Sequence, residues 1–438
     1  MNVPTHPRLL PGLTGTPRVL VLAVLLTVLA IGATFLLDPF RNFQLATAAA
    51  YLCAVAGLTL LIGLSGQLSL GHAALMIAGG YGYALTSNAL TDAGIDGVPR
   101  FVASLAAGVL TATLLGLLLG LAAARLRGPY LAGLTLALVV AVPAITSVWS
   151  GVFRGDQGLQ TAYNPVPPAL ERLIALEQWQ AWVAIIVASV VVTALALLRR
   201  GPLGLRMRAV RDDETAARLN GVPARRVKVT AFTVSAAGAG AGGAVLCFVT
   251  QSVGPGAYTL AFSLLLVVAA VVGGLGSLGG AALGSAVIVV LPWALNAGTA
   301  ALDLPADLSQ RLAGNLSLLV FGALLIAVML LRPTGLAGLA TSWRRRGTGS
   351  GRRPAAGGSG PAAAVAGAGP AAAGTGAASA APAPAPAPAG TGAALSDADA
   401  TPDVARSAAT EPTDAAAHPR PAGTPASTDP SRTIPIER

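Results

Sequence analysis

"VLVLAVLLTVLAIGATFLL" occupies residues 19–37, and this stretch contains no charged side chain. An apolar run of about 20 residues is long enough for a helix to cross a bilayer. Similar runs follow along the chain, of which 54% is hydrophobic and 11% charged. Soluble domains carry about 25% charged residues. We therefore expect an all-α polytopic membrane protein, since a helix satisfies its backbone hydrogen bonds internally within lipid.

The apolar runs predict about ten transmembrane helices. They cover residues 19–37, 43–62, 70–87, 101–124, 130–149, 181–198, 229–250, 260–275, 277–297 and 314–331. The first run is too long for a typical signal-peptide core, so we expect it to be retained as a helix. The abundant glycines, 53 in all, fit helices that pack closely through small side chains.

Arginine placement predicts the orientation, because basic residues concentrate on the cytoplasmic side of membrane spans. The loop 199–228 is the most basic segment between the spans and is expected to be cytoplasmic; its cations are Arg199, Arg200, Arg206, Arg208, Arg211, Arg218, Arg225, Arg226 and Lys228. The spans counted from this loop place both termini in the cytoplasm. The same rule explains the net charge of +10 better than nucleic-acid binding does.

Three segments follow from this layout. Residues 1–17 form a cytoplasmic N-terminal segment, 18–340 a transmembrane domain, and 341–438 a low-complexity tail. The tail contains "PAAAVAGAGPAAAGTGAASAAPAPAPAPAG" and shows no apolar periodicity. Such a composition buries too little apolar area to offset the entropy of ordering, so we expect this tail to be disordered.

The chain lacks the residues for an energy source of its own. A phosphate-binding loop of the Walker type needs a Gly-Lys-Ser/Thr sequence, but the only lysine, Lys228, is followed by Val229. The stretch 229–302 contains no charged residue, whereas proton relays use intramembrane carboxylates or histidines. Any uphill transport must therefore draw its energy from a partner. Cys53 and Cys247 lie in apolar runs and indicate neither a disulfide framework nor a metal site.

The stretch "RAVRDDETAARLNG" at residues 208–221 is densely charged for so apolar a chain. After Pro202, Leu203 and Gly204, the pattern predicts a helix that continues to Asn220. Asp212 or Asp213 can cap a helix N-terminus, and Gly221 suits a left-handed C-terminal stop. The sequence leaves two interpretations open: a helix that docks on a partner, and a solvated loop that follows the positive-inside rule.

A second unusual stretch, "GLSGQLSLGHAALMIAGGYGY" at 63–83, places glycines and polar groups within an apolar run. Irregular backbone at membrane depth must be buried in protein or line a cavity, and broken helices often form transport paths. We consider Gly66, Gln67, Ser69, Gly71 and His72 as candidates for such a path. The alternative is a helix end at the cytoplasmic surface, with His72 merely hydrogen-bonded.

Two further glycine patterns indicate helix packing. "GAGAGG" at 238–243 lies inside an apolar span without a preceding strand, so a dinucleotide site is excluded by its context. Gly276, Gly280 and Gly284 recur on one helix face. "GGLGSLGG" at 273–280 resembles the 63–83 stretch in its mixture of glycine, serine and leucine, and this similarity raises the hypothesis of an internal repeat.

Several of these stretches, in order, resemble a permease subunit of the branched-chain amino-acid ABC importer family over roughly residues 40–340. The stretches are "GLSGQLSLGHAAL" at 63–75, "GDQGL" at 155–159, "GPLGLRMRAVRDDETAARLNGVPARRVKVTAFTVSAAGAGAGGA" at 201–244, "GGLGSLGGAALG" at 273–284 and "LRPTGLAGL" at 331–339. The resemblance implies a bacterial inner (plasma) membrane protein that is not itself an enzyme. It also implies four kinds of association: a second related permease, two cytoplasmic ATPases that bind ATP and Mg, an external substrate-binding protein, and the lipid bilayer.

In the resemblance, stretch 208–221 corresponds to the segment that docks into the ATPase. The residues expected to make this contact are Arg211, Asp212, Asp213, Glu214, Ala216, Ala217, Arg218 and Gly221. The wider importer pattern is Glu-Ala-Ala-x-x-x-Gly; here Thr215 stands at the glutamate position and Glu214 is displaced by one. The expected cargo is a branched-chain (aliphatic) amino acid. Urea, a short amide or another small polar solute is the alternative within the same architecture, and a self-sufficient secondary carrier or channel is the alternative outside it.

Overall fold

The computed structural model describes residues 16–126, 129–168 and 170–300, together with helical residues 316, 319–324, 326–328 and 330. All of these lie in the first of two compact units, Met1–Ala355. The second unit, Ala356–Arg438, lies outside the described residues, as does most of the segment 1–17. The predictions about the N-terminal segment and the tail therefore stay predictions.

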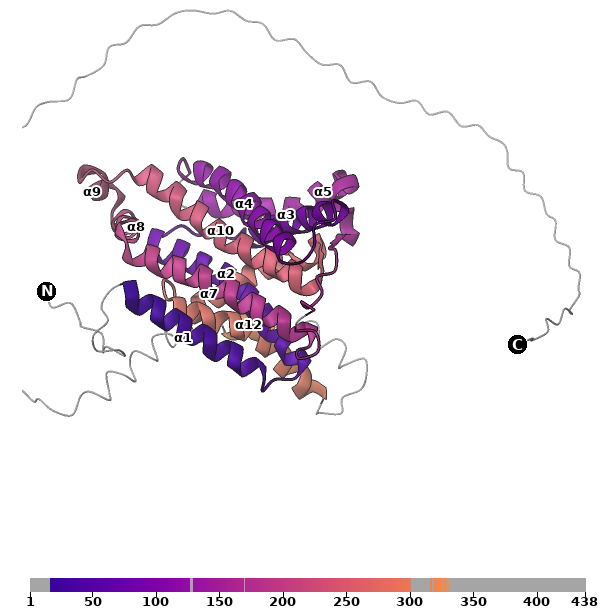
Figure 1. The fold of residues 1–438 in the computed structure, drawn as a ribbon. Helices are drawn as coiled ribbons and strands as arrows, with labels where there is room; N and C mark the ends of the chain where they lie inside the picture. Colours follow the sequence, from indigo (N-terminus) through magenta and orange to yellow (C-terminus); the bar gives the residue numbers. More distant parts are fainter. Residues whose placement is uncertain are drawn as a thin grey trace, which may run out of the picture. The chain divides into compact units, whose positions relative to one another are not determined.

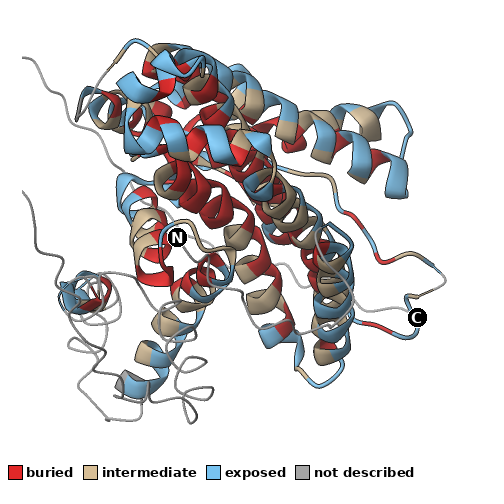
Figure 2. Ribbon diagram, turned by 90° about the vertical axis from the view of Figure 1, so that its left-hand side faces the viewer, coloured by how far each residue is buried: buried red, intermediate tan, exposed pale blue. Residues whose placement is uncertain are grey.

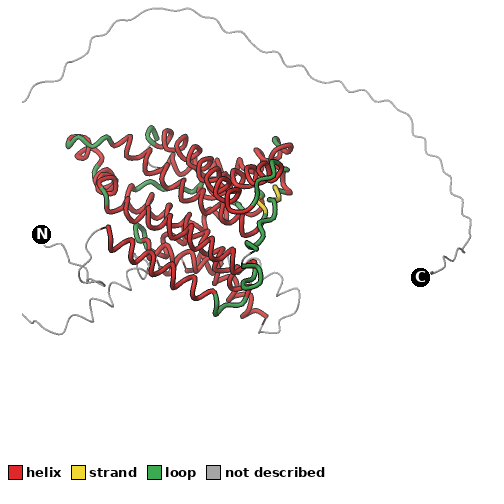
Figure 3. The backbone as a smooth tube through the Cα atoms, viewed as in Figure 1, coloured by secondary structure: helices red, strands yellow, loops and turns green. Residues whose placement is uncertain are grey.

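Helices make up nearly all of the described chain (Figures 1 and 3). The long ones are α1 (Thr16–Thr34), α2 (Pro39–Ser65), α3 (His72–Asp92), α4 (Gly97–Ala123), α5 (Pro129–Val148), α7 (Leu176–Arg200), α10 (Ala224–Thr250), α11 (Leu260–Gly273) and α12 (Leu278–Ala300). The short ones are α6 (Ser150–Phe153), α8 (Pro202–Asp212), α9 (Glu214–Leu219), η1 (Gly155–Gln157) and η2 (Pro255–Ala257). Two short strands, β1 (Leu159–Gln160) and β2 (Ser252–Val253), pair antiparallel, a feature that the sequence reading did not foresee.

Among the described residues, seven helices are long and apolar enough to cross a membrane: α1, α2, α4, α5, α7, α10 and α12. The apolar helices α11 and Leu319–Val328 are shorter. Every span predicted before residue 300 overlaps one of the long helices, α3 included. The all-α, multi-helix membrane architecture is thus confirmed, while the total of ten spans and the cytoplasmic position of the termini stay predictions.

Helix α10 forms the centre of the fold and packs along α2, α3 and α4 (Figure 1). Its "GAGAGG" stretch makes this possible, as the packing interpretation predicted. A Cβ atom added to Gly243 would overlap the carbonyl oxygen of Met76 in α3, and one on Gly242 would lie 2.5 Å from the carbonyl oxygen of Ala50 in α2. Larger side chains at these positions would separate the helices, so the glycines set the interhelical distance.

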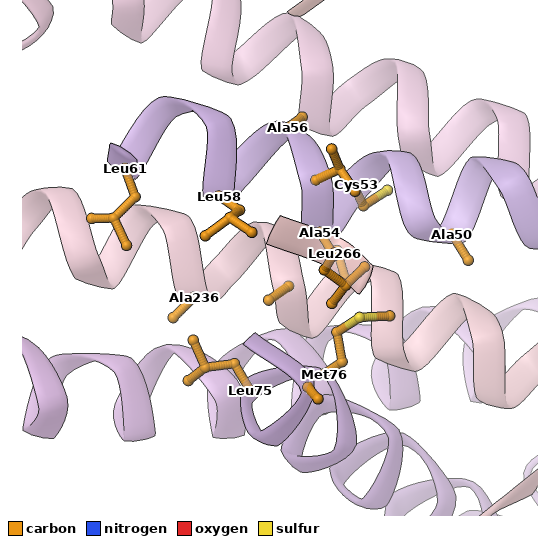
Figure 4. Packing of buried hydrophobic residues seen from close by; sticks show 14 of the residues in the cluster. Ala50, Cys53, Ala54, Ala56, Leu58, Leu61, Leu75, Met76, Ala236 and Leu266 are labelled. Atoms are coloured by element: carbon orange, nitrogen blue, oxygen red, sulfur yellow. The ribbon is translucent and has the colours of Figure 1, made fainter. Parts of the chain in front are cut away.

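The buried core follows these central helices, and the outward faces are exposed (Figure 2). Around α2 the core combines small and branched side chains, including Ala50, Ala54 and Leu58, with Met76 of α3 and Leu266 of α11 (Figure 4). Cys53 and Cys247 are both buried and unpaired with one another. Helix α1 is different, because only Val19 and Thr34 along it are buried.

A buried arginine fixes the connection between α6 and α7. The Arg100 side chain is 2% exposed and donates to Asp96 Oδ1 (2.6 Å), Thr91 Oγ1 (2.7 Å) and the carbonyl oxygen of Tyr163 (2.6 Å). It also donates to Asn164 Oδ1, whose amide in turn contacts the Tyr83 hydroxyl. A buried cation is costly without partners, and here its donors are used to hold the connection against α3 and α4.

Candidate functional site

The charged element, residues 202–221, consists of two helices and not the single one predicted. Helix α8 ends at Asp212, and Asp213 adopts an extended conformation with φ −154° and ψ 108°. The Asp213 carboxylate accepts hydrogen bonds from the backbone N–H groups of Thr215 (2.8 Å) and Ala216 (2.9 Å). Aspartate competes with helix continuation by such bonds and favours N-cap positions. The predicted cap is therefore correct at Asp213, but it begins a separate helix, α9.

The C-terminal stop of α9 is the one that the sequence predicts. Gly221 has φ +78°, a left-handed conformation that only glycine adopts without strain. The backbone N–H of Val222 donates to the carbonyl of Ala217 (3.0 Å), and that of Gly221 donates to the carbonyl of Arg218 (3.0 Å). These bonds satisfy carbonyl groups that the helix end leaves without partners. The element thus ends sharply before α10 begins.

The charged element presents one outward face and one inward face. Arg218, Ala216 and Leu219 are exposed, with 85% of the Leu219 surface accessible. Ala217 is 5% exposed and belongs to the buried apolar cluster. Leu219 is a candidate contact for a partner because it stands on the exposed face of the charged element. The sequence alone gives no signal for Leu219, because the charges and small residues around it do not show which side of the helix is exposed.

Several charges of the element are paired within the chain. Glu214 accepts from Lys228 Nζ at 2.6 Å and from Arg218. The hydrogen bond from Lys228, with the charges of Lys228 and Arg218, lowers the pKa of the Glu214 carboxyl. Arg211 pairs with Asp212 at 2.8 Å. Glu214, which stands one position before the glutamate of the importer pattern, therefore anchors α9 to the start of α10.

The second candidate region is the α2–α3 junction, residues 66–71. Helix α2 ends because Gly66 is left-handed (φ +68°), and α3 begins at His72. The intervening backbone is held by side chains from other helices: Leu70 N–H donates to Thr135 Oγ1 of α5 (3.0 Å), and Ser263 Oγ of α11 donates to Leu70 O (2.5 Å). These bonds satisfy irregular backbone that lipid could not.

His72 is fully buried between two serines. Its Nδ1 lies 3.1 Å from Ser69 Oγ and its Nε2 lies 2.9 Å from Ser235 Oγ of α10. Gln67, Ser69 and Gly71 are also buried, whereas Gly66 is exposed. The structure thus packs the polar groups of the junction between helices. Their role in a translocation path stays a prediction, and no cluster of three metal-ligating side chains occurs among the described residues.

The two candidate regions are in direct contact. Arg211 of α8 donates to the carbonyl oxygen of Gly63 in the last turn of α2, and its side chain lies over Gly66, where an added Cβ would be 2.8 Å from Arg211 Cγ. On the other side, Gln67 Nε2 donates to the carbonyl of Lys228 (3.3 Å), the residue that binds Glu214. Both helices of the charged element are therefore linked to the junction, α8 directly and α9 through Lys228.

A second glycine turn, residues 274–277 between α11 and α12, contacts the end of α2. The prediction that Gly276 shares a helix face with Gly280 and Gly284 is therefore wrong, because Gly276 lies in this turn with φ +76°. A Cβ added to Gly63 would overlap the backbone of Gly276, and the Gly276 N–H donates to Thr59 O (3.2 Å). The stretches "GQLSLGHAAL" (66–75) and "GLGSLGGAAL" (274–283) share the pattern G-x-x-S-L-G-x-A-A-L, and each begins with a positive-φ glycine just after a helix. The two similar stretches thus form two similar junctions, α2–α3 and α11–α12, which are in contact with one another.

Comparison with known proteins shows the family of the chain. Residues 40–329 match the family model described as "Branched-chain amino acid transport system / permease component". The chain belongs to this family. It is 29% identical over 350 residues to the high-affinity branched-chain amino acid transport system permease protein LivM of Escherichia coli K12, which covers 75% of this chain and 77% of that protein. It is also 29% identical over 301 residues to LivM of Salmonella typhimurium LT2, covering 64% and 66% respectively. No solved structure gives a significant match.

Family membership and the apolar helices together make the chain a multi-pass plasma-membrane protein of the ABC-transporter permease type. Such permease components belong to multi-subunit transporters and are not themselves enzymes. The match covers both junctions and the whole charged element. The two regions in contact are therefore part of the family's shared domain.

Proposed function

We propose that the chain is the membrane-spanning permease subunit of an ATP-driven importer for branched-chain amino acids, coupled to separate ATPase subunits through the charged element. The proposed partners are a second related permease, two cytoplasmic ATPases that bind ATP and Mg, and an external binding protein. The proposed orientation places the charged element in the cytoplasm. The printed names of the LivM relatives support the choice of cargo.

One observation carries the coupling role: Arg211 and the Glu214–Lys228 pair connect the exposed α8–α9 surface to the α2–α3 junction. A partner that moves α9 acts through these contacts on the ends of α2 and α3. Coupling between distant sites needs such a contiguous set of contacts and an element with two arrangements. The junction is the natural candidate for that element, because it is the irregular segment between two long helices.

Docking is tested by changing the outward face of α9 without changing its inward contacts. Leu219→Asp places a charge where the exposed apolar side chain stands, and we expect loss of ATPase co-purification and of ATP-dependent uptake. Leu173→Asp is the matched control, since Leu173 is 76% exposed but precedes α7, at the opposite end from the charged element. ATPase association and uptake that survive both Leu219→Asp and deletion of residues 208–221 would exclude the coupling role.

The cargo is tested separately. Proteoliposomes that contain the complete importer, with the external binding protein added outside, are loaded with ATP-regenerating components. Accumulation of leucine, isoleucine or valine supports the proposal, whereas accumulation of urea or short amides supports the alternative cargo. A self-sufficient carrier would give uptake by the permease without ATPases.

A further inference from the structure

A large apolar cavity lies between α1, α2, α7 and α12, and the described residues that line it include none from the charged element or from the α2–α3 junction. Its volume is about 510 Å³. Leu22 and Leu26 of α1, Leu45 and Leu52 of α2 and Val192 of α7 are among the side chains that line it. These four helices belong to the set long enough to cross a membrane. The cavity therefore lies within the hydrocarbon layer.

The cavity lies beside α1, which packs chiefly along α7 and meets α2 near its C-terminal end, where Asn42 Nδ2 of α2 donates to Thr34 O (3.2 Å). Thr27 of α1 donates to Ser189 of α7 at 2.6 Å, which holds the two helices together. On the other side, Gly279 of α12, which lines the cavity, has no atoms within 4 Å of an added Cβ. This openness contrasts with α10, whose glycines touch neighbouring backbones. Figure 1 shows α1 at the edge of the helix bundle, next to α7.

One end of the cavity is basic. Arg200, the last residue of α7, lines it beside Val19 and Gly279, near the first residues of α1 and α12. The chain from Arg199 to Arg211 contains further arginines and no acidic residue. This is the end from which the charged element emerges. Basic pockets between membrane helices on the cytoplasmic side attract anionic lipid headgroups.

We propose that this cavity binds one acyl chain of an anionic phospholipid, with the lipid phosphate at Arg200. Apart from Arg200 the wall is mostly apolar and carries no carboxylate, so an amino-acid ammonium group would have no anionic partner there and the cavity does not suit the transported solute. Each methylene group that leaves water for such a wall contributes favourably. The assignment to the cytoplasmic leaflet rests on the orientation proposed above, but the site itself does not.

Native mass spectrometry of the purified full chain tests this proposal. The chain is delipidated in detergent and titrated with phosphatidylglycerol or phosphatidylcholine of identical acyl chains. We expect one tightly bound phosphatidylglycerol, held about fivefold more tightly than phosphatidylcholine. Ala23→Phe fills the cavity from α1 and should abolish this binding. Val24→Phe is the matched control, because Val24 is 64% exposed and does not line the cavity.

Arg200→Gln separates the headgroup contact from the acyl-chain contact. It should remove the preference for phosphatidylglycerol and leave residual binding of both lipids. If Ala23→Phe fails to fold, as judged by size-exclusion chromatography, Ala282→Phe fills the cavity from α12 instead. Equal binding of the two lipids, unaffected by the filling variants, would mean annular lipid and would overturn the proposal. Cross-linking of residue 23 to a second permease chain in place of bound lipid would also overturn it.

Discussion

Replacing Arg211 with glutamine should uncouple ATP hydrolysis from transport without dissociating the ATPases. The arginine supplies a charge-assisted hydrogen bond to Gly63 O and places a cation at the C-terminal end of α2. A hydrogen bond to a charged group contributes about 1.5–3 kcal/mol, and a cation at a helix C-terminus about 0.3–1 kcal/mol. Because the side chain is 42% exposed, the lower ends of these ranges apply. We expect a loss of about 1–2 kcal/mol of coupling free energy, which is roughly a 5- to 30-fold change.

The assay is the ratio of ATP hydrolysed to leucine accumulated in proteoliposomes that contain the whole importer. Arg211→Gln should raise this ratio about 5- to 30-fold while ATPase co-purification stays at the wild-type level. Asp212→Asn is the control, since it removes the negative charge paired with Arg211 but not the contact of Arg211 with Gly63, and exposed ion pairs contribute little. A wild-type ratio in Arg211→Gln, or an equal effect of Asp212→Asn, would refute the reasoning.

Four further predictions concern the same contacts. Gly221→Val forces a β-branched residue into a left-handed conformation at a cost of about 1–2 kcal/mol, so uptake should fall more than membrane insertion does; equal losses would indicate a folding role. Thr135→Val leaves the Leu70 N–H without an acceptor and should lower stability by about 1–3 kcal/mol in thermal unfolding, whereas Thr113→Val, whose hydroxyl bonds only to its own helix, should change it less. Gly243→Ala should cost about 1–3 kcal/mol or more through overlap with Met76 O, and Gly133→Ala, with open space around it, should not reduce the yield of monodisperse protein. Since the pKa of Glu214 is lowered in the fold, its stabilisation of α9 is present above the ordinary glutamate pKa and is lost as pH falls through the lowered value; the protection factors of the α9 amides, corrected for the intrinsic exchange rate at each pH, should fall more on acidification in the wild type than in Glu214→Gln.

The helices and the termini of α9 could be predicted from the sequence because both depend on local chemistry. Apolar runs fix helices in lipid wherever they occur, and the Asp213 cap and Gly221 stop need only their own neighbours. The break between α8 and α9 also has a local cause, the bonds from Asp213 to the next turn. It was missed because continuation of the helix through Asp212 and Asp213 is equally compatible with residue propensities.

The contacts between the charged element and the junction could not be predicted. Arg211 contacts Gly63, which lies nearly 150 residues earlier in the chain, and a single sequence does not reveal such long-range contacts. The burial of Ala217 could not be predicted either, because the sequence does not distinguish it from the exposed Ala216 beside it. His72 could be recognised as unusual, yet its serine partners on either side depend on how α10 lies against α3. Which side chains are exposed and which are buried in an element of this kind is decided by tertiary packing.

The most direct test of coupling through the charged element measures movement at the junction. Leu68 is 44% exposed, so a cysteine at this position can carry an environment-sensitive fluorophore, while the native Cys53 and Cys247 are buried and unreactive. In the assembled importer, ATP should change the fluorescence, and Arg211→Gln should abolish the change while the ATPases remain bound. A fluorescence change that persists in Arg211→Gln, or active transport without any change at residue 68, would contradict the account.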